Sequence, residues 1–178
     1  MAVLHIWSPD DAMLGFVAPV ALAMAAGTAL VVDLDEEGPQ YPGEVTLASL
    51  VRDGPRAADL QPTRKGVALL RNGGIAEANA AEAIDALTVG WPNLVLRLPA
   101  HPPPVRQSVV PVLPLTPLTL DRGPAVFQRG PWAAPERPNG VVLPRPRAST
   151  IRSLLAGRRP GPSRWLRAWR EVWGIAWA

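Results

Sequence analysis

The sequence predicts an α/β fold in three layers, in which a mostly parallel sheet carries helices on both faces. Short apolar segments alternate with helix-like segments along most of the chain. These short segments lack the polar alternation of a half-exposed strand, which is typical of parallel strands buried on both faces. A length of 178 residues with 48% hydrophobic residues suits one compact domain with an appendage and excludes a disordered chain.

The N-terminal elements follow the order of a β-α-β unit. Residues 3–7 form the first expected strand, and a turn leads into an apolar helix over residues 13–26. Residues 30–34 are apolar and largely β-branched up to an acidic end, which predicts a second buried strand. A loop rich in Glu, Gly and Pro over residues 36–44 then precedes a short helix at residues 46–53.

The same alternation continues further along the chain. Residues 66–70 form the third expected strand, and an Asn-Gly-Gly break precedes an Ala-rich helix near residues 76–87. Residues 93–98 form a fourth strand that ends at a proline. Residues 109–113 form a fifth strand, which Pro111 places at an edge of the sheet or makes irregular.

The expected organisation has three parts. Residues 1–120 form the α/β domain, residues 121–147 a connection rich in Pro and Arg, and residues 148–178 a basic helical tail. Thirteen prolines fall within residues 99–146, so we expect extended, polyproline-like chain there and no further core. Within the tail, one helix is expected at residues 148–156 and a second, amphipathic helix follows it.

Charge is divided unevenly along the chain. Residues 1–121 hold 7 Lys/Arg against 13 Asp/Glu, a balance of −6, and residues 122–178 hold 11 Arg against 2 Glu, a balance of +9. Such asymmetry indicates a partner surface, a membrane surface, nucleic acid, or one half of the chain folding onto the other. The charge pattern alone does not choose among these alternatives.

A run of 21 uncharged residues, 12–32, is long enough to span a bilayer. Pro19 and the break at residues 27–28 divide it into a helix-like part and a strand-like part. Asp10 and Asp11 precede it where a signal peptide would carry basic residues. We therefore expect a buried helix followed by a buried strand, with a membrane span as the alternative.

The composition excludes several kinds of chemistry. The chain has no Cys, which excludes disulfides, thiol catalysis and Cys-type metal centres. His5 and His101 are the only histidines, so a site with several histidine ligands is not expected. We recognise no catalytic set, and we expect no catalytic residue, no cofactor and no metal.

The order of segments resembles a known family. Residues 3–7, Ser8-Pro9, the apolar helix and Val31-Val32-Asp33-Leu34-Asp35-Glu36-Glu37-Gly38 resemble the start of MinD/ParA-type ATPases, which carry a deviant Walker motif. Residues 46–50, 66–70, 90–99 and 114–117 fit later segments of the same family. The resemblance covers about residues 1–120 and implies a P-loop NTPase-like fold.

The phosphate-binding residues of that family are missing. Its loop reads Ser-Pro-Lys-Gly-Gly-Val-Gly-Lys-Thr-Thr, whereas residues 8–17 read Ser-Pro-Asp-Asp-Ala-Met-Leu-Gly-Phe-Val. Asp10 stands at the signature Lys, Gly15 at the catalytic Lys and Phe16 at the metal-binding Thr. Two carboxylates in this loop would repel a triphosphate. Arg97 stands at the Walker B Asp, so we interpret the chain as a pseudo-ATPase that does not transfer phosphoryl groups.

Acidic residues follow the first two predicted strands. Because loops after parallel strands gather at one edge of the sheet, an acidic rim is expected there. Its members are Asp10, Asp11, Asp33, Asp35, Glu36 and Glu37. The rim would dock a basic partner, the Arg-rich tail or a divalent cation, or it would consist of solvated carboxylates that cap a helix and loops. Residues 71–74 predict either an anion site built from backbone amides or an ordinary turn.

Four tryptophans recur at every fourth residue near the C-terminus and would form one stripe of a continuous helix. They are Trp165, Trp169, Trp173 and Trp177. Arginines that include Arg167 and Arg170 would occupy the opposite side of this helix. The stripe would bind a protein partner, pack on its own domain or rest at a membrane interface. MinD relatives use a C-terminal amphipathic helix at membranes, so the resemblance adds to the last alternative.

These observations predict a cytoplasmic, non-enzymatic adaptor that assembles with a protein partner through its Trp/Arg helix. The resemblance implies that the partner is an active MinD/ParA-type ATPase or a second copy. One alternative is a membrane-peripheral scaffold held by the C-terminal helix, and another is an ATPase with a non-standard loop. Specific nucleic-acid binding is not expected, because the sequence has no helix-turn-helix, RNP or zinc pattern.

Overall fold

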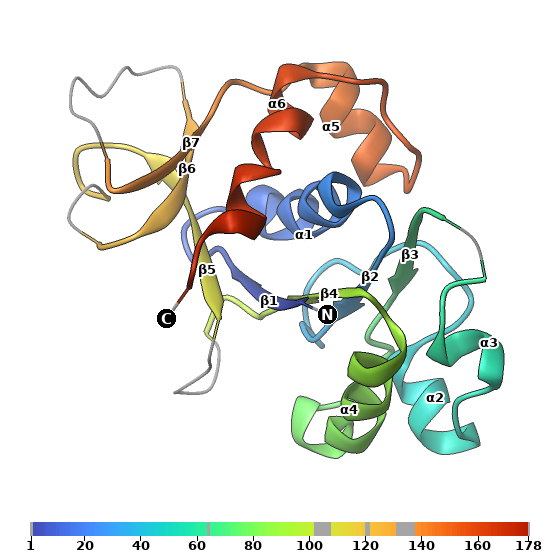
Figure 1. The fold of residues 1–178 in the computed structure, drawn as a ribbon. Coiled ribbons are helices and arrows are strands. Elements are labelled where there is room, and N and C mark those ends of the chain that lie inside the picture. Colours follow the sequence, from blue (N-terminus) through green and yellow to red (C-terminus); the bar gives the residue numbers. More distant parts are fainter. Residues whose placement is uncertain (1, 64, 102–107, 120–121, 131–137, 178) are drawn as a thin grey trace.

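A parallel sheet forms the centre of the molecule (Figure 1). The computed structural model describes residues 2–63, 65–101, 108–119, 122–130 and 138–177. Its strands are β1 (Ala2–Trp7), β2 (Ala29–Asp33), β3 (Val67–Leu70), β4 (Asn93–Arg97), β5 (Val109–Leu115), β6 (Ala125–Arg129) and β7 (Gly140–Leu143). They pair in the order β3-β2-β4-β1-β5-β6-β7, and every pair is parallel. The predicted α/β fold is confirmed, and the sheet is compatible with a P-loop-like fold.

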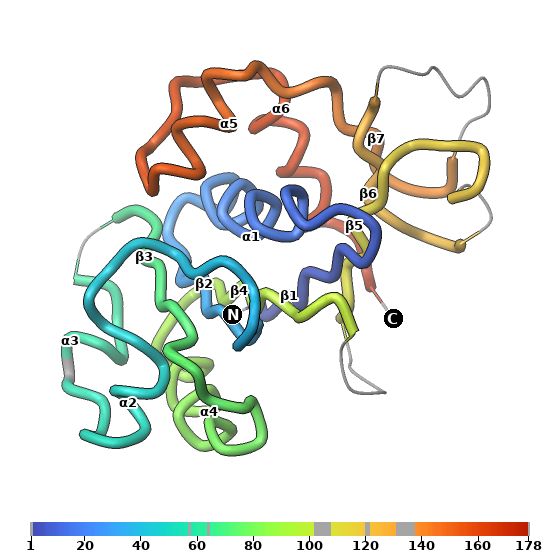
Figure 2. Tube along the Cα trace, turned by 180° about the vertical axis from the view of Figure 1, so that it is seen from behind, coloured from blue at the N-terminus to red at the C-terminus, as the bar shows by residue number. Residues whose placement is uncertain are grey.

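Helices cover both faces of this sheet. They are α1 (Ala12–Ala26), α2 (Leu47–Asp53), α3 (Ala57–Leu60), α4 (Ala81–Gly90), α5 (Ala148–Leu155) and α6 (Arg164–Ala168), with 3₁₀ turns at Glu77–Asn79 and Glu171–Gly174. The opposite views of Figures 1 and 2 place α1, α5 and α6 on one face and α2, α3 and α4 on the other. Each face has its own hydrophobic core.

The uncharged run at residues 12–32 folds as the buried helix α1 and the buried strand β2. α1 is apolar on all sides because the sheet lies beneath it and α5 and α6 lie above it. It begins at Asp11, whose side chain accepts a hydrogen bond from the Leu14 amide, and Pro19 lies inside it. Within the described ranges, no helix is both long enough and apolar enough to cross a membrane.

The prediction of extended chain without further core over residues 99–146 is wrong. β6 and β7 lie in that region and extend the same sheet, and Val126, Phe127 and Leu143 are fully buried. The prolines that suggested a polyproline connection stand mainly outside these two short strands. The predicted connection at residues 121–147 therefore supplies two strands of the sheet.

Of the two alternatives for Pro111, an edge position or an irregular strand, the edge position is wrong, because β5 lies between β1 and β6. β5 pairs with β1 through Val109, Val110 and Pro111 and with β6 from Val112 onwards. Each half of β5 is thus paired along one side only. Pro111 is tolerated because it stands where the pairing passes from one neighbour to the other.

The C-terminal helix is shorter than predicted. α6 ends at Ala168, and a turn and the 3₁₀ segment Glu171–Gly174 continue the chain in place of a continuous helix. The break lets the indoles reach different parts of the molecule. Trp173 donates from Nε1 to the Leu22 carbonyl of α1 at 3.0 Å, whereas Trp165 donates to the Gln128 side chain of β6 at 2.6 Å.

Candidate functional site

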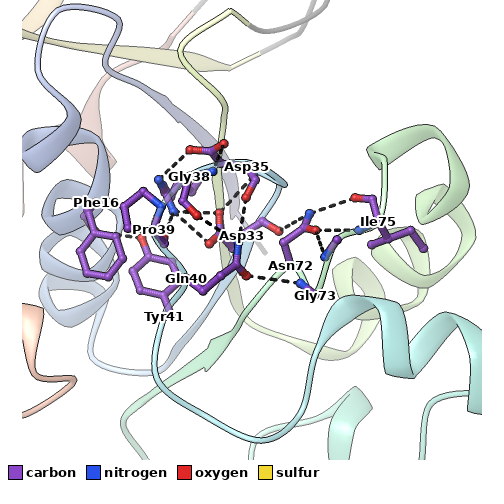
Figure 3. A network of polar contacts seen from close by, with 12 residues as sticks. Phe16, Asp33, Asp35, Gly38, Pro39, Gln40, Tyr41, Asn72, Gly73 and Ile75 are labelled. Carbon is purple, nitrogen blue, oxygen red and sulfur yellow. Dashed lines mark hydrogen bonds and ion pairs between the residues drawn. The ribbon is translucent and has the colours of Figure 1, made fainter.

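Arg97 organises the carboxyl edge of the sheet, where the strands β2 and β4 end side by side. Its guanidinium, which is buried, donates from Nη1 to Oδ2 of Asp33 at 2.9 Å and from Nη2 to Oδ2 of Asp35 at 2.7 Å. Nη1 also donates to the Pro39 carbonyl at 2.8 Å. Figure 3 shows Asp33, Asp35 and Pro39, the residues that accept these hydrogen bonds, close together. We call Arg97, Asp33, Asp35, Phe16 and Tyr41 the Arg97 cluster.

Two aromatic rings close this cluster on the α1 side. The guanidinium carbon of Arg97 lies 5.4 Å from the Phe16 ring centroid and 5.6 Å from the Tyr41 ring centroid, within the range of cation–π attraction. The two rings are 4.6 Å apart. The Tyr41 hydroxyl donates to the Phe16 carbonyl at 2.9 Å, which fastens the loop after β2 to the first half of α1. The cluster is therefore packed as well as charge-paired.

Burial raises the pKa of two groups in the cluster, the Asp33 carboxyl and the Tyr41 hydroxyl. It raises the pKa of the fully buried Asp33 carboxyl from 3.8 to about 6, although the Arg97 guanidinium and the Asp35 amide act in the opposite direction. Burial also raises the pKa of the Tyr41 hydroxyl well above its usual value of 10.0. Tyr41 therefore stays neutral and keeps its proton for the Phe16 carbonyl.

The predicted degenerate phosphate loop forms a capped helix start. The Asp11 carboxylate accepts from the Leu14 amide at 3.0 Å, and the Asp11 carbonyl accepts from the Gly15 amide at 2.9 Å. In a phosphate-binding loop, such amides point at the ligand. Asp10 lies at the surface and pairs with Arg122 at 2.9 Å. Phe16 points into the Arg97 cluster, so these four predicted residues do not share one site.

The predicted acidic rim divides into two parts. Asp33 and Asp35 belong to the Arg97 cluster, whereas Glu36 and Glu37 are exposed. The two glutamates line a groove of about 610 Å³ at the carboxyl edge, together with Glu77 and His101. Across the described residues, no group of three or more His, Cys, Asp or Glu side chains is placed to hold a metal ion.

The alternative of an anion site at residues 71–74 is not supported by the local hydrogen bonds. The buried Asn72 side chain accepts from the amides of Gly74 and Ile75, each at 2.8 Å. Its amide group donates to the carbonyls of Asp33 and Ile75 at 3.3 and 3.0 Å (Figure 3). The amides that would meet an anion are thus satisfied within the turn.

The C-terminal tryptophans pack against their own domain. Trp165 and Trp169 are buried and contact each other edge to face at 5.6 Å. Trp173 and Trp177 are half-buried and pack against the same core. The exposed residues of this predicted set are Arg167 and Arg170. The alternative that the tryptophans pack on their own domain therefore holds for Trp165 and Trp169, which do not form an exposed stripe.

Sequence reasoning missed the pairing that holds the cluster together. It identified Asp33, Asp35 and Arg97 separately but did not join them, and it did not single out Tyr41. A signal was present, because β2 and β4 were expected to end at one edge with an acid and a base. In the structure Asp33 and Arg97 are direct partners in the register of these strands. The role of Tyr41 had no comparable signal, since it comes from an irregular loop.

No protein-family model matches the sequence, and no curated protein matches it.

Proposed function

We propose that the protein is a non-enzymatic adaptor, a MinD/ParA-like pseudo-ATPase that assembles with a protein partner in the cytoplasm. The observation that carries this proposal is the Arg97 cluster. It fills, with paired charges and rings, the edge of a parallel sheet where ligands ordinarily bind. The proposal combines this geometry with the resemblance of residues 1–120 to that family.

The electrostatics of the carboxyl edge argue against a triphosphate. Arg97 already faces two carboxylates, so its cluster has no surplus positive charge to offer. Asp11 accepts from the amides of Leu14 and Gly15 in the first turn of α1, and Asp10 precedes it in the chain. In-line phosphoryl transfer needs donors and cations arranged around the transferred group. The residues at this edge supply carboxylates instead.

The same edge presents apolar groups to solvent. Met13, in the first turn of α1, is 50% exposed, and Leu118, in the loop after β5, is 87% exposed. Both follow the carboxyl ends of the neighbouring strands β1 and β5, so they lie at one edge of the sheet. We place the partner contact here, because the indoles of the C-terminal segment are largely taken up by the core. In the resembled family dimers form across this face, which makes an active relative or a second copy the expected partner.

Magnesium-ATP provides the first test. We expect millimolar MgATP to leave the backbone amide resonances of residues 11–16 and 33–41 unchanged in two-dimensional ¹H–¹⁵N spectra, because the Arg97 guanidinium is already paired with two carboxylates and Asp10 and Asp11 would repel the phosphates. Magnesium chloride at equal concentration serves as the control for salt effects. Saturable shifts centred on Gly15 and Asp33 would contradict the pseudo-ATPase assignment.

A second test addresses the partner contact. The double substitution Met13→Asp with Leu118→Asp is expected to abolish the native complex, measured by sedimentation velocity and cross-linking, because it places charge in the apolar contact. Val89→Asp is the matched control, since Val89 is 83% exposed on α4, away from this edge. Each variant should melt within a few degrees of the wild type. Retention of the complex by the double variant would place the contact elsewhere.

A further inference from the structure

A second concave site lies at the opposite, amino edge of the sheet. It is formed by the end of α1, the start of β3, the α5–α6 connection and α6, and it encloses about 670 Å³. Four cationic side chains line it, and we call this site the cationic groove. They are Lys65, Arg159, Arg167 and Arg170.

These four cations are exposed, and none of their side chains makes a hydrogen bond or an ion pair within the part of the chain that the structure describes. Among the described residues, no Asp or Glu belongs to the lining of the groove. Like charges around one cavity repel one another, and an anion placed between them removes that repulsion. Arginine in particular binds phosphate through paired, parallel hydrogen bonds.

Apart from the Ser163 hydroxyl and the backbone of three glycines, the rest of the groove is apolar. Met24 at the end of α1, Val67 at the start of β3 and Leu166 on α6 are half-buried and line it together with Pro160 and Pro162. Its volume lies in the range of roughly 300–1,000 Å³ that small-molecule sites occupy. A ligand for this groove would therefore combine an anionic group with an apolar body.

Hydroxyl groups adjoin the groove on one side. A smaller cavity of about 120 Å³ shares Pro160, Pro162 and Ser163 with it and adds Arg147, Ser149 and Ser153. No acidic residue of the described segments lines this cavity either. Arginine and serine donors suit a group with several acceptor oxygens, and phosphate is such a group.

We propose that the cationic groove binds a small organic phosphate, with its phosphate group among Arg159, Arg167 and Arg170. Its apolar body would lie over Met24 and Leu166. The concave, bounded shape built from four segments favours a small molecule over an extended polymer or a flat surface. This site is separate from the Arg97 cluster at the other edge of the sheet, so it stands independently of the adaptor function.

Calorimetry with three probes tests the proposal on the full chain: 1-naphthyl phosphate, 1-naphthol and inorganic phosphate. We expect 1-naphthyl phosphate to bind at least tenfold more tightly than either of the other two, because it carries both halves of the expected ligand. Arg167→Glu with Arg170→Glu should weaken its binding at least tenfold. The control Arg129→Glu with Arg152→Glu changes the net charge equally at exposed positions outside the groove lining and should bind as the wild type does.

Lys65→Glu with Arg159→Glu repeats the test on other segments if the first variant melts at a lower temperature than the wild type. Absence of 1-naphthyl phosphate binding would overturn the proposal, as would equal losses in the groove and control variants. A third contrary result would be binding of anionic phospholipid vesicles without binding of the small phosphate. That result would show that the groove contacts a lipid surface and does not hold a small molecule. Loss confined to the two groove variants supports the site.

Discussion

Arg97→Met is expected to lower the free energy of unfolding by about 3–5 kcal/mol at about pH 8, the usual cost of breaking a buried ion pair on one side. Arg97 is the cationic partner of Asp33, which is 0% exposed and cannot regain water when the guanidinium is removed. Methionine fills much of the space but satisfies neither carboxylate. Urea unfolding followed by tryptophan fluorescence measures the change.

The loss should depend on pH because of Asp33. Its pKa of about 6 in the folded protein lies above the ordinary 3.8, so the stability that it contributes is complete below pH 3.8 and is lost as the pH rises through about 6. Without the opposing guanidinium this pKa rises further, and the loss extends to higher pH. The difference in free energy of unfolding between the wild type and Arg97→Met is therefore smallest in acid. There it should be about 1–3 kcal/mol, the cost of leaving neutral polar groups unsatisfied.

Two further variants test whether the loss of stability comes from the buried ion pair of Arg97 and Asp33. Asp33→Asn combined with Arg97→Met removes both charges, and it should recover part of the stability and most of the pH dependence. Arg52→Met removes an arginine from an exposed pair with Asp53 and should leave stability almost unchanged, because water screens an exposed ion pair. A loss for Arg97→Met that stays the same from acid to alkaline pH would show that the buried carboxylate does not cause it.

Trp165→Ala is expected to cost about 3–5 kcal/mol, the usual range for removing a large aromatic side chain from a core. Trp165 is 1% exposed, contacts Trp169 edge to face, and donates to the Gln128 side chain at 2.6 Å. Truncation leaves a cavity between α6 and β6 and removes the proton that Gln128 accepts. Thermal and urea unfolding measure the loss.

The neighbouring Arg164→Ala serves as the control, because Arg164 is exposed and its replacement should change stability by about 0.5 kcal/mol or less. Trp165→Phe should fall between the two, since it keeps a ring but loses the bond to Gln128. Equal stability of Trp165→Ala and Arg164→Ala would mean that the C-terminal segment contributes little to the core. For the same reason, deleting residues 164–178 would disturb folding before it reported on binding.

The fold was predictable where each strand carried its own local signal. Apolar β-branched runs such as Ala29–Asp33 and Asn93–Arg97 identify buried parallel strands by composition alone. Ala125–Arg129 and Gly140–Leu143 are just as apolar, but the surrounding prolines concealed them. The four-residue spacing of the tryptophans predicted a single continuous helix, which the structure does not contain in the described residues. The segment instead breaks after Ala168, because contacts with α1 and β6 decide its path.

The absence of phosphate-binding residues could be predicted from the sequence, whereas the cluster that takes their place at the carboxyl edge could not. Comparing residues 8–17 with a phosphate loop shows that lysine and threonine are absent, which needs no structure. The pairing of Arg97 with Asp33 joins positions 64 residues apart, and only strand register brings them together. The Phe16 and Tyr41 rings complete the cluster through packing, for which the sequence holds no periodic signal.

The contact between Trp173 and Leu22 joins positions 151 residues apart in the chain. During synthesis on the ribosome, the apolar helix α1 emerges well before the indoles that cover it. Until they emerge, its outer side must be shielded by transient contacts or by chaperones, because exposed apolar surface on a nascent chain promotes aggregation. The residues between Leu22 and Trp173 must therefore leave the exit tunnel before this side of the molecule is sealed.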